Sequence, residues 1–425
     1  MKRFLFLFKK IFSFYYLVKN KKIVIQYSNP KKSKIILVDH VREIEVKKAL
    51  LNDIEFETLD TRFSMINEID NYTRKPRIFF SLKIILLIFY FFFFRKTNSL
   101  FNSYCYAIIY IIKPKVVLDI SHYGFILEGV RFFPNTNFIF LLEGLFKKGD
   151  ESFSFKIDKN VFHYYLLDFL KRNKNLNLGN LYLGLQGERD IDILNDLGLK
   201  NSKNGLNLFL SGSYKADYVR KNITNDYKKK YDILFISQTK SEYILNREKN
   251  SFIDLLITET GRILKLLSYY VINKNISCLI QLRTSNRFAK IEKEFFKSFF
   301  KDYKKLYFED RKDPFNAYYS ILKSNVTISN HSELSREAMV LGQKSVYIPF
   351  KIYDFYIQNP NKFESFSSMW DWHISSNDQK EFGKKIDKLI NLDIKKYLEE
   401  TSNKSNYFIK KNSKFKKIIL EMIYN

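Results

Sequence analysis

The sequence predicts an α/β protein with mainly parallel sheets, built as two successive units. Short apolar runs alternate with segments long enough for crossover helices, which is the pattern of parallel sheets covered by helices. A polar, charged stretch without apolar periodicity, 219–230, interrupts this alternation and is expected to link the two units. With 425 residues, 46% of them hydrophobic, the chain is too long for one ordinary core.

The first unit is expected to hold a parallel sheet. Its strands are predicted from runs of branched and aromatic residues at 23–26, 34–38, 116–120, 138–142, 181–185 and 208–210. The segments 46–52 and 101–112 are expected to be crossover helices. We therefore predict an N-terminal acceptor domain over 21–218, preceded by a separate segment, 1–20.

The second unit repeats the plan. A strand is predicted at 231–236, a helix at 252–273 and a second strand at 277–282. Helices at 291–300 and 316–323 precede the strongest strand–helix–strand pattern of the chain. These elements predict a C-terminal domain over 231–392. The last stretch, 393–425, is helical in pattern and rich in lysine.

The most informative segment is 321–350. An apolar run that includes Val326 and Ile328 leads into a polar turn, a helix at 333–341 ends at Gly342, and a second apolar run follows. The turn after the first strand lies at the carboxyl edge of a parallel sheet, where the helix N-terminus attracts anions. The alternative is that Asn330 or Ser332 only caps the helix.

This segment resembles the donor-binding unit of GT-B glycosyltransferases, in particular bacterial surface carbohydrate biosynthesis proteins. The likeness rests on a Ser-rich turn, a Glu in the following helix and a Gly-Gln-Lys turn, here Ser332-Glu333-Leu334, Arg336-Glu337-Ala338 and Gly342-Gln343-Lys344. Three other stretches resemble further parts of that group: 34–51, 115–144 and 210–213. In the second of these the family has Asp-Asn before a helix, whereas this chain has Asp119 followed by Ile120.

The resemblance implies a GT-B-like fold, with two Rossmann-like domains facing a cleft and a C-terminal helix crossing back to the first domain. It implies a glycosyltransferase that moves a sugar from a nucleotide-activated donor to a surface polysaccharide or lipid-linked glycan acceptor. Three alternatives stay open. They are a polyol-phosphate transferase of the teichoic-acid type, a sugar-nucleotide 2-epimerase and a non-catalytic GT-B-like membrane or assembly protein, the last because of the departure after Asp119.

Polar residues that follow the strands of the second domain form the expected donor site. They are Ser237, Gln238, Thr239, Arg283, Ser332, Glu333, Ser335 and Glu337. Arg283 would clamp a diphosphate with two hydrogen bonds, unless it forms an ordinary surface ion pair. Glu337 would accept hydrogen bonds from ribose or sugar hydroxyls, unless it is solvated or paired with Arg336 or Lys344.

Inverting sugar transfer needs a base that takes the proton of the acceptor hydroxyl. His122 is the preferred base, with Asp119 as the carboxylate that orients it; Asp119 itself or Glu143 are the alternatives. Asp39 and His40 follow a predicted strand in the same way and are further candidates. No Asp-x-Asp motif stands at a strand end, so we expect neither a metal nor a cofactor. Cations and helix dipoles would then stabilise the leaving nucleotide.

The formal net charge of +27 favours an anionic partner. Nucleic acid is not expected, because the lysines are spread along the chain without a nucleic-acid-binding motif. Residues 1–20 mix bulky aromatics with Lys and Arg and lack a small-residue cleavage site, so they predict an amphipathic segment on an anionic membrane surface. The segment 77–95 is either a short span or a helix docked on the first domain.

These features predict a bacterial protein that is peripheral on the inner, cytoplasmic face of the cytoplasmic membrane. The two cysteines, Cys105 and Cys278, both lie in apolar stretches. They are expected to be buried thiols of a protein in a reducing compartment.

Overall fold

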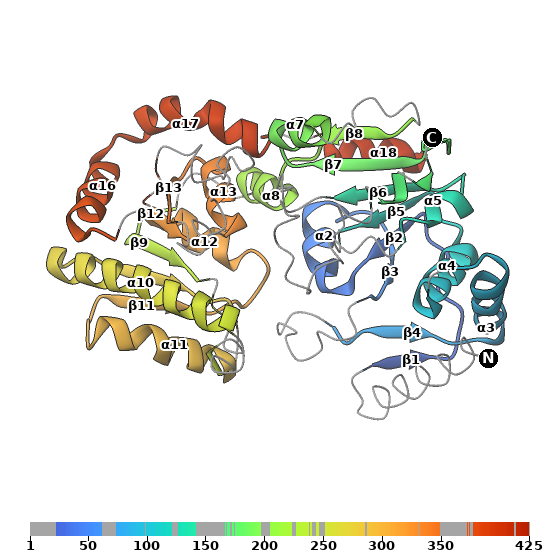
Figure 1. Ribbon diagram of the computed structural model, residues 1–425, viewed down its shortest axis with the longest axis horizontal. Coiled ribbons are helices and arrows are strands. Elements are labelled where there is room, and N and C mark those ends of the chain that lie inside the picture. Colours follow the sequence, from blue (N-terminus) through green and yellow to red (C-terminus); the bar gives the residue numbers. More distant parts are fainter. Residues whose placement is uncertain are drawn as a thin grey trace.

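The computed structural model describes most of the chain. The described residues are 23–61, 74–97, 99–120, 126–141, 166, 168–170, 172–173, 175–196, 205–222, 227–237, 239, 244–245, 251–284, 287–330, 332–348, 372, 374, 377–411 and 414–424. Within them, two parallel β-sheets lie in two halves of the molecule, and each is accompanied by helices (Figure 1). The predicted α/β architecture is confirmed. The amphipathic segment predicted at 1–20 lies outside the described residues.

The first sheet has six strands in the order β3-β2-β5-β6-β7-β8, and every neighbouring pair is parallel. The strands are β2 (Ile35–Val38), β3 (Glu57–Leu59), β5 (Val116–Asp119), β6 (Asn137–Leu141), β7 (Leu181–Leu185) and β8 (Asn207–Leu210). Side chains alternate between two apolar clusters, with Ile36 and Val38 in one and Ile35 and Leu37 in the other. Both faces are therefore covered, as parallel sheets require.

Helices from distant parts of the chain cover the two faces. They are η1 (His40–Arg42), α2 (Glu43–Ala49), α3 (Leu82–Phe89), α4 (Leu100–Ile112), α5 (Gly129–Phe132) and α7 (Glu188–Asp196). The cluster on one face includes Tyr106 and Ile109 of α4, and the cluster on the other includes Val46 of α2. A separate parallel pair, β1 (Val24–Gln26) and β4 (Arg77–Phe79), lies beside this half.

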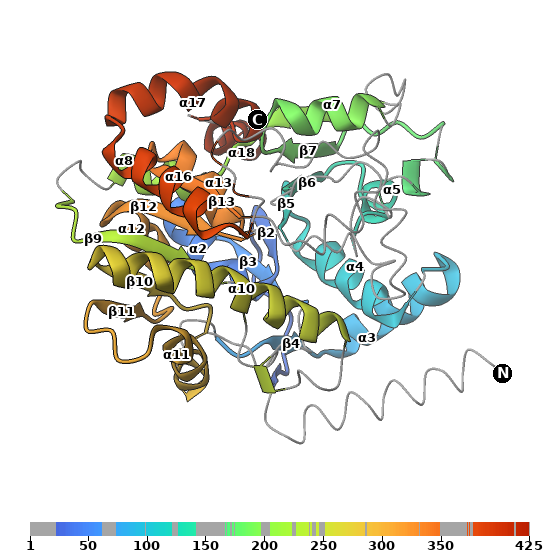
Figure 2. The ribbon, with the colours of Figure 1, turned by 60° about the vertical axis from the view of Figure 1, so that its left-hand side comes forward.

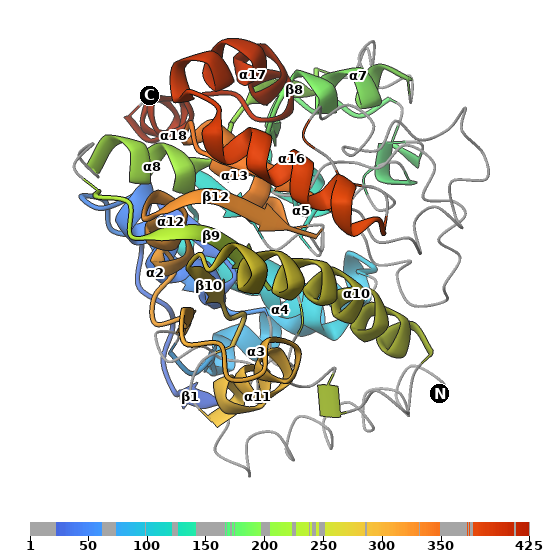
Figure 3. The same cartoon turned by 90° about the vertical axis from the view of Figure 1, so that its left-hand side faces the viewer.

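The second sheet has five parallel strands in the order β11-β10-β9-β12-β13. They are β9 (Tyr231–Ile236), β10 (Cys278–Gln281), β11 (Leu306–Glu309), β12 (Ser324–Ser329) and β13 (Lys344–Tyr347). Its helices are α10 (Ser251–Lys274), α11 (Arg287–Phe300), α12 (Asn316–Leu322), α13 (Glu333–Val340) and α16 (Gln379–Asn391). Figure 3 shows α10 and α16 running beside each other, where the Tyr270 hydroxyl donates to Asp387 over 2.7 Å.

The C-terminal helices return to the first half, as predicted. Helix α17 (Ile394–Phe408) contacts both α13 and α7, and α18 (Phe415–Tyr424) packs on the first sheet (Figure 1). Phe415, Ile419 and Ile423 are buried there. At the crossing, a Cβ on Gly187 would lie 2.5 Å from the carbonyl of Phe408, so only glycine lets the two backbones approach this closely.

Some elements differ from the sequence-based expectation. The short strands β3, β4 and β11 were not predicted. Polar residues in β3 and β11 break the apolar run that marks a strand, and β4 lies in the segment 77–95 that was expected to be a span or a docked helix. Helix α8 (Tyr214–Asn222) extends into the stretch predicted as a linker. Ala216 and Val219 on this helix are fully buried against the second core, so α8 is a packed connection between the halves.

The segment 77–95 forms β4, then α3, then a π-helical stretch, η3 (Tyr90–Phe94). Ile84 and Phe91 are buried in the first core, so the helix is docked on the domain by one face. Among the described residues, none of the helices combines the length and hydropathy needed to cross a bilayer. Cys105 and Cys278 are buried free thiols, and burial raises the pKa of each well above its ordinary value.

Candidate active site

The carboxyl edge of the second sheet gathers several of the predicted donor-site residues. Ser237 follows β9, Arg283 follows β10 and Ser332 follows β12, and β9 lies between the other two strands. The backbone ladder continues past the strand ends, since the N–H of Ser237 donates to the Gln281 carbonyl over 3.1 Å. These residues therefore stand along one edge, as the sequence predicted. Gln238 and the side chain of Glu333 lie outside the described residues.

Ser332 is the N-cap of α13. Its backbone is extended, and its hydroxyl accepts a hydrogen bond from the N–H of Leu334 over 3.3 Å. Ser335 is fully buried and its hydroxyl donates to the carbonyl of Ser332, 2.5 Å away. Capping is thus one role of this turn, and the Ser335 hydroxyl is used within the first turn of the helix. The positive end of the helix still points to the carboxyl edge of the sheet.

Asn330 is the residue of this edge that the sequence singled out only as a possible cap. It is fully buried, and among the described residues neither its amide oxygen nor its amide nitrogen has a hydrogen-bond partner. The hydroxyl of the preceding residue, Ser329, is also buried without a hydrogen-bond partner among the described residues. Leaving such groups unpaired costs about 1–3 kcal/mol each, so these two side chains are candidate contacts for a bound molecule.

The other donor-site side chains are held by neighbouring helices. The Ser237 hydroxyl accepts from the N–H of Thr239 over 3.1 Å, and the Thr239 hydroxyl bonds to Thr260 of α10 over 3.2 Å. The backbone N–H of Arg283 donates to the buried carboxylate of Glu292, whose pKa is raised by burial. Helices α10 and α11 therefore fix the two loops that carry Ser237 and Arg283.

Glu337 is buried and connects the two halves. Its carboxylate accepts hydrogen bonds from the Tyr318 hydroxyl over 2.7 Å and from the Ser213 hydroxyl over 2.5 Å. Ser213 belongs to the loop after β8 in the first half, while Tyr318 lies on α12 in the second. The sequence anticipated a solvated carboxylate, an ion pair or a ligand contact at this position; the structure places a hydrogen-bonded link between the halves there.

Glu45 of α2 makes a second link. Its buried carboxylate contacts Arg42 at 2.9 Å and Tyr214 at 3.3 Å, and Lys215 lies 4.0 Å away. Arg311, which follows β11 in the second half, lies 3.9 Å from the same carboxylate. Ser213 stands just beyond the carboxyl end of β8 and Arg311 just beyond that of β11, so each link joins one carboxyl edge to a helix of the other half.

The edge of the first sheet is acidic. Asp119 ends β5 and is 2% exposed, and the neighbouring strand β2 leads directly into Asp39, which is fully buried. Asp39 has φ of 95°, a strained backbone conformation for a residue other than glycine and one that is concentrated at functional sites. His40 beside it is also buried. The predicted catalytic residues His122 and Glu143 lie outside the described residues.

The strained turn at Asp39 was missing from the preferred catalytic set. Its sequence signal is the same as that of Asp119, a polar residue directly after an apolar run. What the sequence lacks is the pairing of β2 with β5, which brings residues 39 and 119 to the same edge of the sheet. Among the described residues, no group of three or more His, Cys, Asp or Glu side chains is arranged to hold a metal ion.

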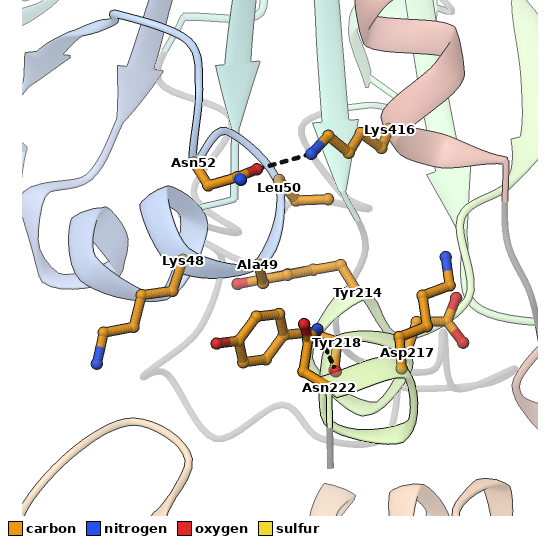
Figure 4. A pocket seen from close by; sticks show the side chains of 10 residues that line it. Lys48, Ala49, Leu50, Asn52, Tyr214, Asp217, Tyr218, Asn222 and Lys416 are labelled. Carbon is orange, nitrogen blue, oxygen red and sulfur yellow. Dashed lines mark hydrogen bonds between the residues drawn. The ribbon is translucent and has the colours of Figure 1, made fainter. Parts of the chain in front are cut away.

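A cavity of about 290 Å³ lies at the junction of α2, α8 and α18 (Figure 4). It is lined by Lys48, Ala49, Leu50, Asn52, Tyr214, Asp217, Tyr218, Lys221, Asn222 and Lys416. The Lys416 ammonium donates to the Asn52 amide oxygen over 2.7 Å, which ties α18 to the end of α2. None of the predicted site residues lines this cavity, so it is distinct from the edges described above.

Comparison with protein families decides the membership of the chain. The family described as "putative O-antigen biosynthesis protein" matches residues 194–423, more than half of the chain. The chain belongs to this family. The matched region begins within α7 and includes α8, the second sheet and the C-terminal helices. A comparison with curated proteins finds no match.

Solved structures with a similar fold include a UDP-GlcNAc 2-epimerase, a complex with UDP and a wall teichoic acid polymerase. The UDP-GlcNAc 2-epimerase from Methanocaldococcus jannaschii has a TM-score of 0.52 and 14% identity, covering 93% of this chain and all of that one. The S. aureus MnaA–UDP complex has a TM-score of 0.53 and 12% identity, covering 92% and 96%. The wall teichoic acid polymerase TagF has a TM-score of 0.51 and 12% identity, covering 92% and 88%. These likenesses confirm the predicted GT-B-like fold.

Proposed function

We propose that the protein is a glycosyltransferase of surface polysaccharide assembly, moving a sugar from a nucleotide-activated donor to a polysaccharide or lipid-linked acceptor. The observation that carries this proposal is the chemical difference between the two facing carboxyl edges. The second edge offers a guanidinium, a helix N-terminus and a buried amide without a partner among the described residues, which suit a nucleoside diphosphate. The first edge offers buried carboxylates, which suit a base.

The family and the fold support the same assignment. O-antigens are surface polysaccharides, which agrees with an acceptor of that class. Two of the structures with a similar fold carry UDP or UDP-sugar names, which favours a nucleotide-sugar donor. Arg283 would hold the diphosphate, and Asn330 and Ser332 would hydrogen-bond to the donor from the β12–α13 turn.

In the proposed reaction the acceptor hydroxyl attacks the anomeric carbon of the donor. The new C–O bond forms as the bond between that carbon and the diphosphate oxygen breaks. His122, oriented by Asp119, takes the hydroxyl proton, or Asp119 or Glu143 takes it directly. Arg283 and the N-terminus of α13 stabilise the charge that develops on the leaving nucleotide, so that no metal is required.

The test is a panel of UDP-, GDP-, CMP- and CDP-linked compounds incubated with the full chain and with lipid-linked acceptors. We expect nucleotide release that depends on the acceptor, with one nucleotide base preferred. Arg283→Ala should weaken donor binding by about 1–3 kcal/mol. Lys290→Ala is the matched control, because Lys290 is an exposed cation on α11 outside the site.

Each alternative gives a different result in the same panel. Interconversion of the donor sugar without an acceptor indicates an epimerase, and release of CMP from a CDP-polyol indicates a polyol-phosphate transferase. The absence of both turnover and nucleotide binding for every compound would exclude an enzyme of this class.

A further inference from the structure

Helix α3 and the π-helical stretch η3 expose an unusual apolar face. The exposed fractions of its side chains are 74% for Leu82, 60% for Leu86 and 78% for Phe94. Phe89, Tyr90 and Phe93 are exposed by 42%, 41% and 37%. We call these six residues the α3 face. A surface helix of a globular protein normally turns polar residues outward, so the α3 face is a candidate interaction surface.

The α3 face is one continuous surface. Its members are spaced by three or four residues, which places them along one side of a helix. The rings of Phe89 and Phe93 stack with centroids 6.0 Å apart, and those of Tyr90 and Phe94 with centroids 6.1 Å apart. The opposite side of the helix is already used, because Ile84 and Phe91 are buried in the first core. Helix α3 packs there against α4 (Figure 2). The helix is therefore well packed on its inner side, and the exposure of its outer side does not result from poor packing.

The charged residues around the α3 face are all positive. Between residues 74 and 118 the chain has eight Lys and Arg residues and neither Asp nor Glu. Lys83, Arg95 and Lys96 are exposed, and they lie within or directly next to the α3 face. Cations bordering an apolar, aromatic surface match the two layers of an anionic membrane, the phosphates outside and the acyl chains beneath.

The length of the helix fixes how it meets the membrane. The stretch 82–94 has thirteen residues and is about 20 Å long at the α-helical rise, whereas a bilayer core is about 30 Å thick. One side is also committed to the domain core. The segment therefore cannot cross the bilayer and has the geometry of a helix lying in the interface plane, with its apolar side about 5–10 Å deep.

We propose that the α3 face docks the first half of the protein on an anionic lipid bilayer. Helix α3 lies at the end of the first half away from the second sheet (Figure 1), so docking leaves the second half free of the bilayer. The inference goes beyond the proposed sugar transfer and does not depend on it. It adds a folded contact surface to the membrane contact predicted for residues 1–20.

The test must report on α3 itself, because residues 1–20 are also expected to bind lipid. A single cysteine for an environment-sensitive fluorophore is introduced as Leu86→Cys in the full chain; Cys105 and Cys278 are buried and react poorly. The matched control is Tyr269→Cys, which labels α10 at a position 58% exposed in the second half. Vesicles of phosphatidylcholine alone are compared with vesicles containing phosphatidylglycerol.

We expect a blue shift and quenching by brominated lipid at position 86 with the anionic vesicles, and neither at position 269. In cosedimentation, Leu86→Ser combined with Phe94→Ser should weaken binding about tenfold or more. Lys83→Gln and Lys96→Gln should each weaken binding to anionic vesicles about fivefold and leave phosphatidylcholine vesicles unaffected. Tyr269→Ser should leave binding to both kinds of vesicle unchanged.

Two results would overturn the proposal. One is a label at position 86 whose fluorescence still reports an aqueous environment while the protein sediments with vesicles. Residues 1–20 would then account for all of the membrane binding. The other is a dimer in lipid-free solution that Leu86→Ser and Phe94→Ser dissociate without any loss of vesicle binding. In that case a second copy of the chain covers the α3 face.

Discussion

The carboxyl edges of the two sheets have the same backbone geometry and opposite chemistry. The first holds the buried carboxylates Asp39, Asp60 and Asp119, while the second holds Ser332, Asn330 and Arg283. An anionic donor would be repelled by the first edge and attracted by the second. The fold thus supplies two similar frames. In the proposed reaction, the residue types after the strands would let the second frame bind the phosphate and the first handle the proton.

The acids of the first edge differ among themselves. Asp60 is held by Arg74 through two hydrogen bonds of 2.6 and 2.8 Å, and burial nevertheless raises its pKa. Asp39 accepts the N–H of Val41 over 3.1 Å in its strained turn. Asp60 therefore has a structural role as the partner of Arg74, while Asp119, which ends strand β5, is the catalytic candidate that the sequence predicted.

The largest expected effect is on turnover. Asp119→Asn should lower the rate of sugar transfer by about 10²–10⁴-fold and leave nucleotide affinity unchanged, because a base or its orienting carboxylate is lost. Steady-state kinetics and calorimetric titration measure the two quantities. Asp60→Asn is the control, and it should lower the melting temperature while the folded fraction keeps its activity. Equal losses of turnover in the two variants would contradict the assignment of a catalytic role to Asp119 and a structural role to Asp60.

The next effect concerns the link between the two halves. Ser213→Ala should destabilise the protein by about 1.5–3 kcal/mol, since a hydrogen bond to a buried carboxylate is lost. Tyr318→Phe removes the other bond to Glu337 within the second half and should cost a similar amount. Hydrogen exchange distinguishes them, because only Ser213→Ala should increase exchange in both α8 and α13. Identical exchange patterns would mean that Glu337 does not couple the halves.

A smaller effect is a pH dependence at the helix crossing. Burial raises the pKa of Asp190 on α7 to about 7, against the attraction of Arg189 and Arg336. The folded state therefore binds this proton more tightly than the unfolded state, and the contribution to stability is largest below about pH 4. It is lost as the pH rises toward 7, by at most about 1.4 kcal/mol per pH unit. Asp190→Asn should flatten this slope in denaturant unfolding measured from pH 5 to pH 8.

The smallest effect tests the cap of α13. Ser332→Ala should raise the dissociation constant of the nucleotide about fivefold, the equivalent of about 1 kcal/mol, if the turn holds the donor. Loss of the cap alone predicts a fall in stability of about 1 kcal/mol with unchanged affinity. Titration beside thermal melts separates these outcomes. An unchanged affinity would mean that Ser332 does not bind the nucleotide, and that Arg283 and Asn330 are the remaining candidates at this edge.

The sequence predicted the strands of both sheet centres because those strands are apolar on both faces. β7 and β9 have the bounds that were predicted, Leu181–Leu185 and Tyr231–Ile236. The edge strands β3 and β11 were not predicted, because Glu57 and Glu309 at their ends break the apolar pattern. The last turn of helix α8, 219–222, was assigned to the linker for a similar reason. Its buried stripe is narrow, and only packing against the second core reveals it.

By itself the sequence determined the two-part α/β plan and the placement of Ser332 and Arg283 after strands. These follow from local periodicity and from polar residues at strand ends, which one stretch of chain contains in full. The tertiary structure alone decided which distant residues meet. Glu337 joins Ser213 across 124 positions, and Asp39 and Asp119 come to the same edge of the sheet through the pairing of β2 with β5. Contacts of this kind depend on strand order and on the packing of the two halves, and neither leaves a periodic mark in the sequence.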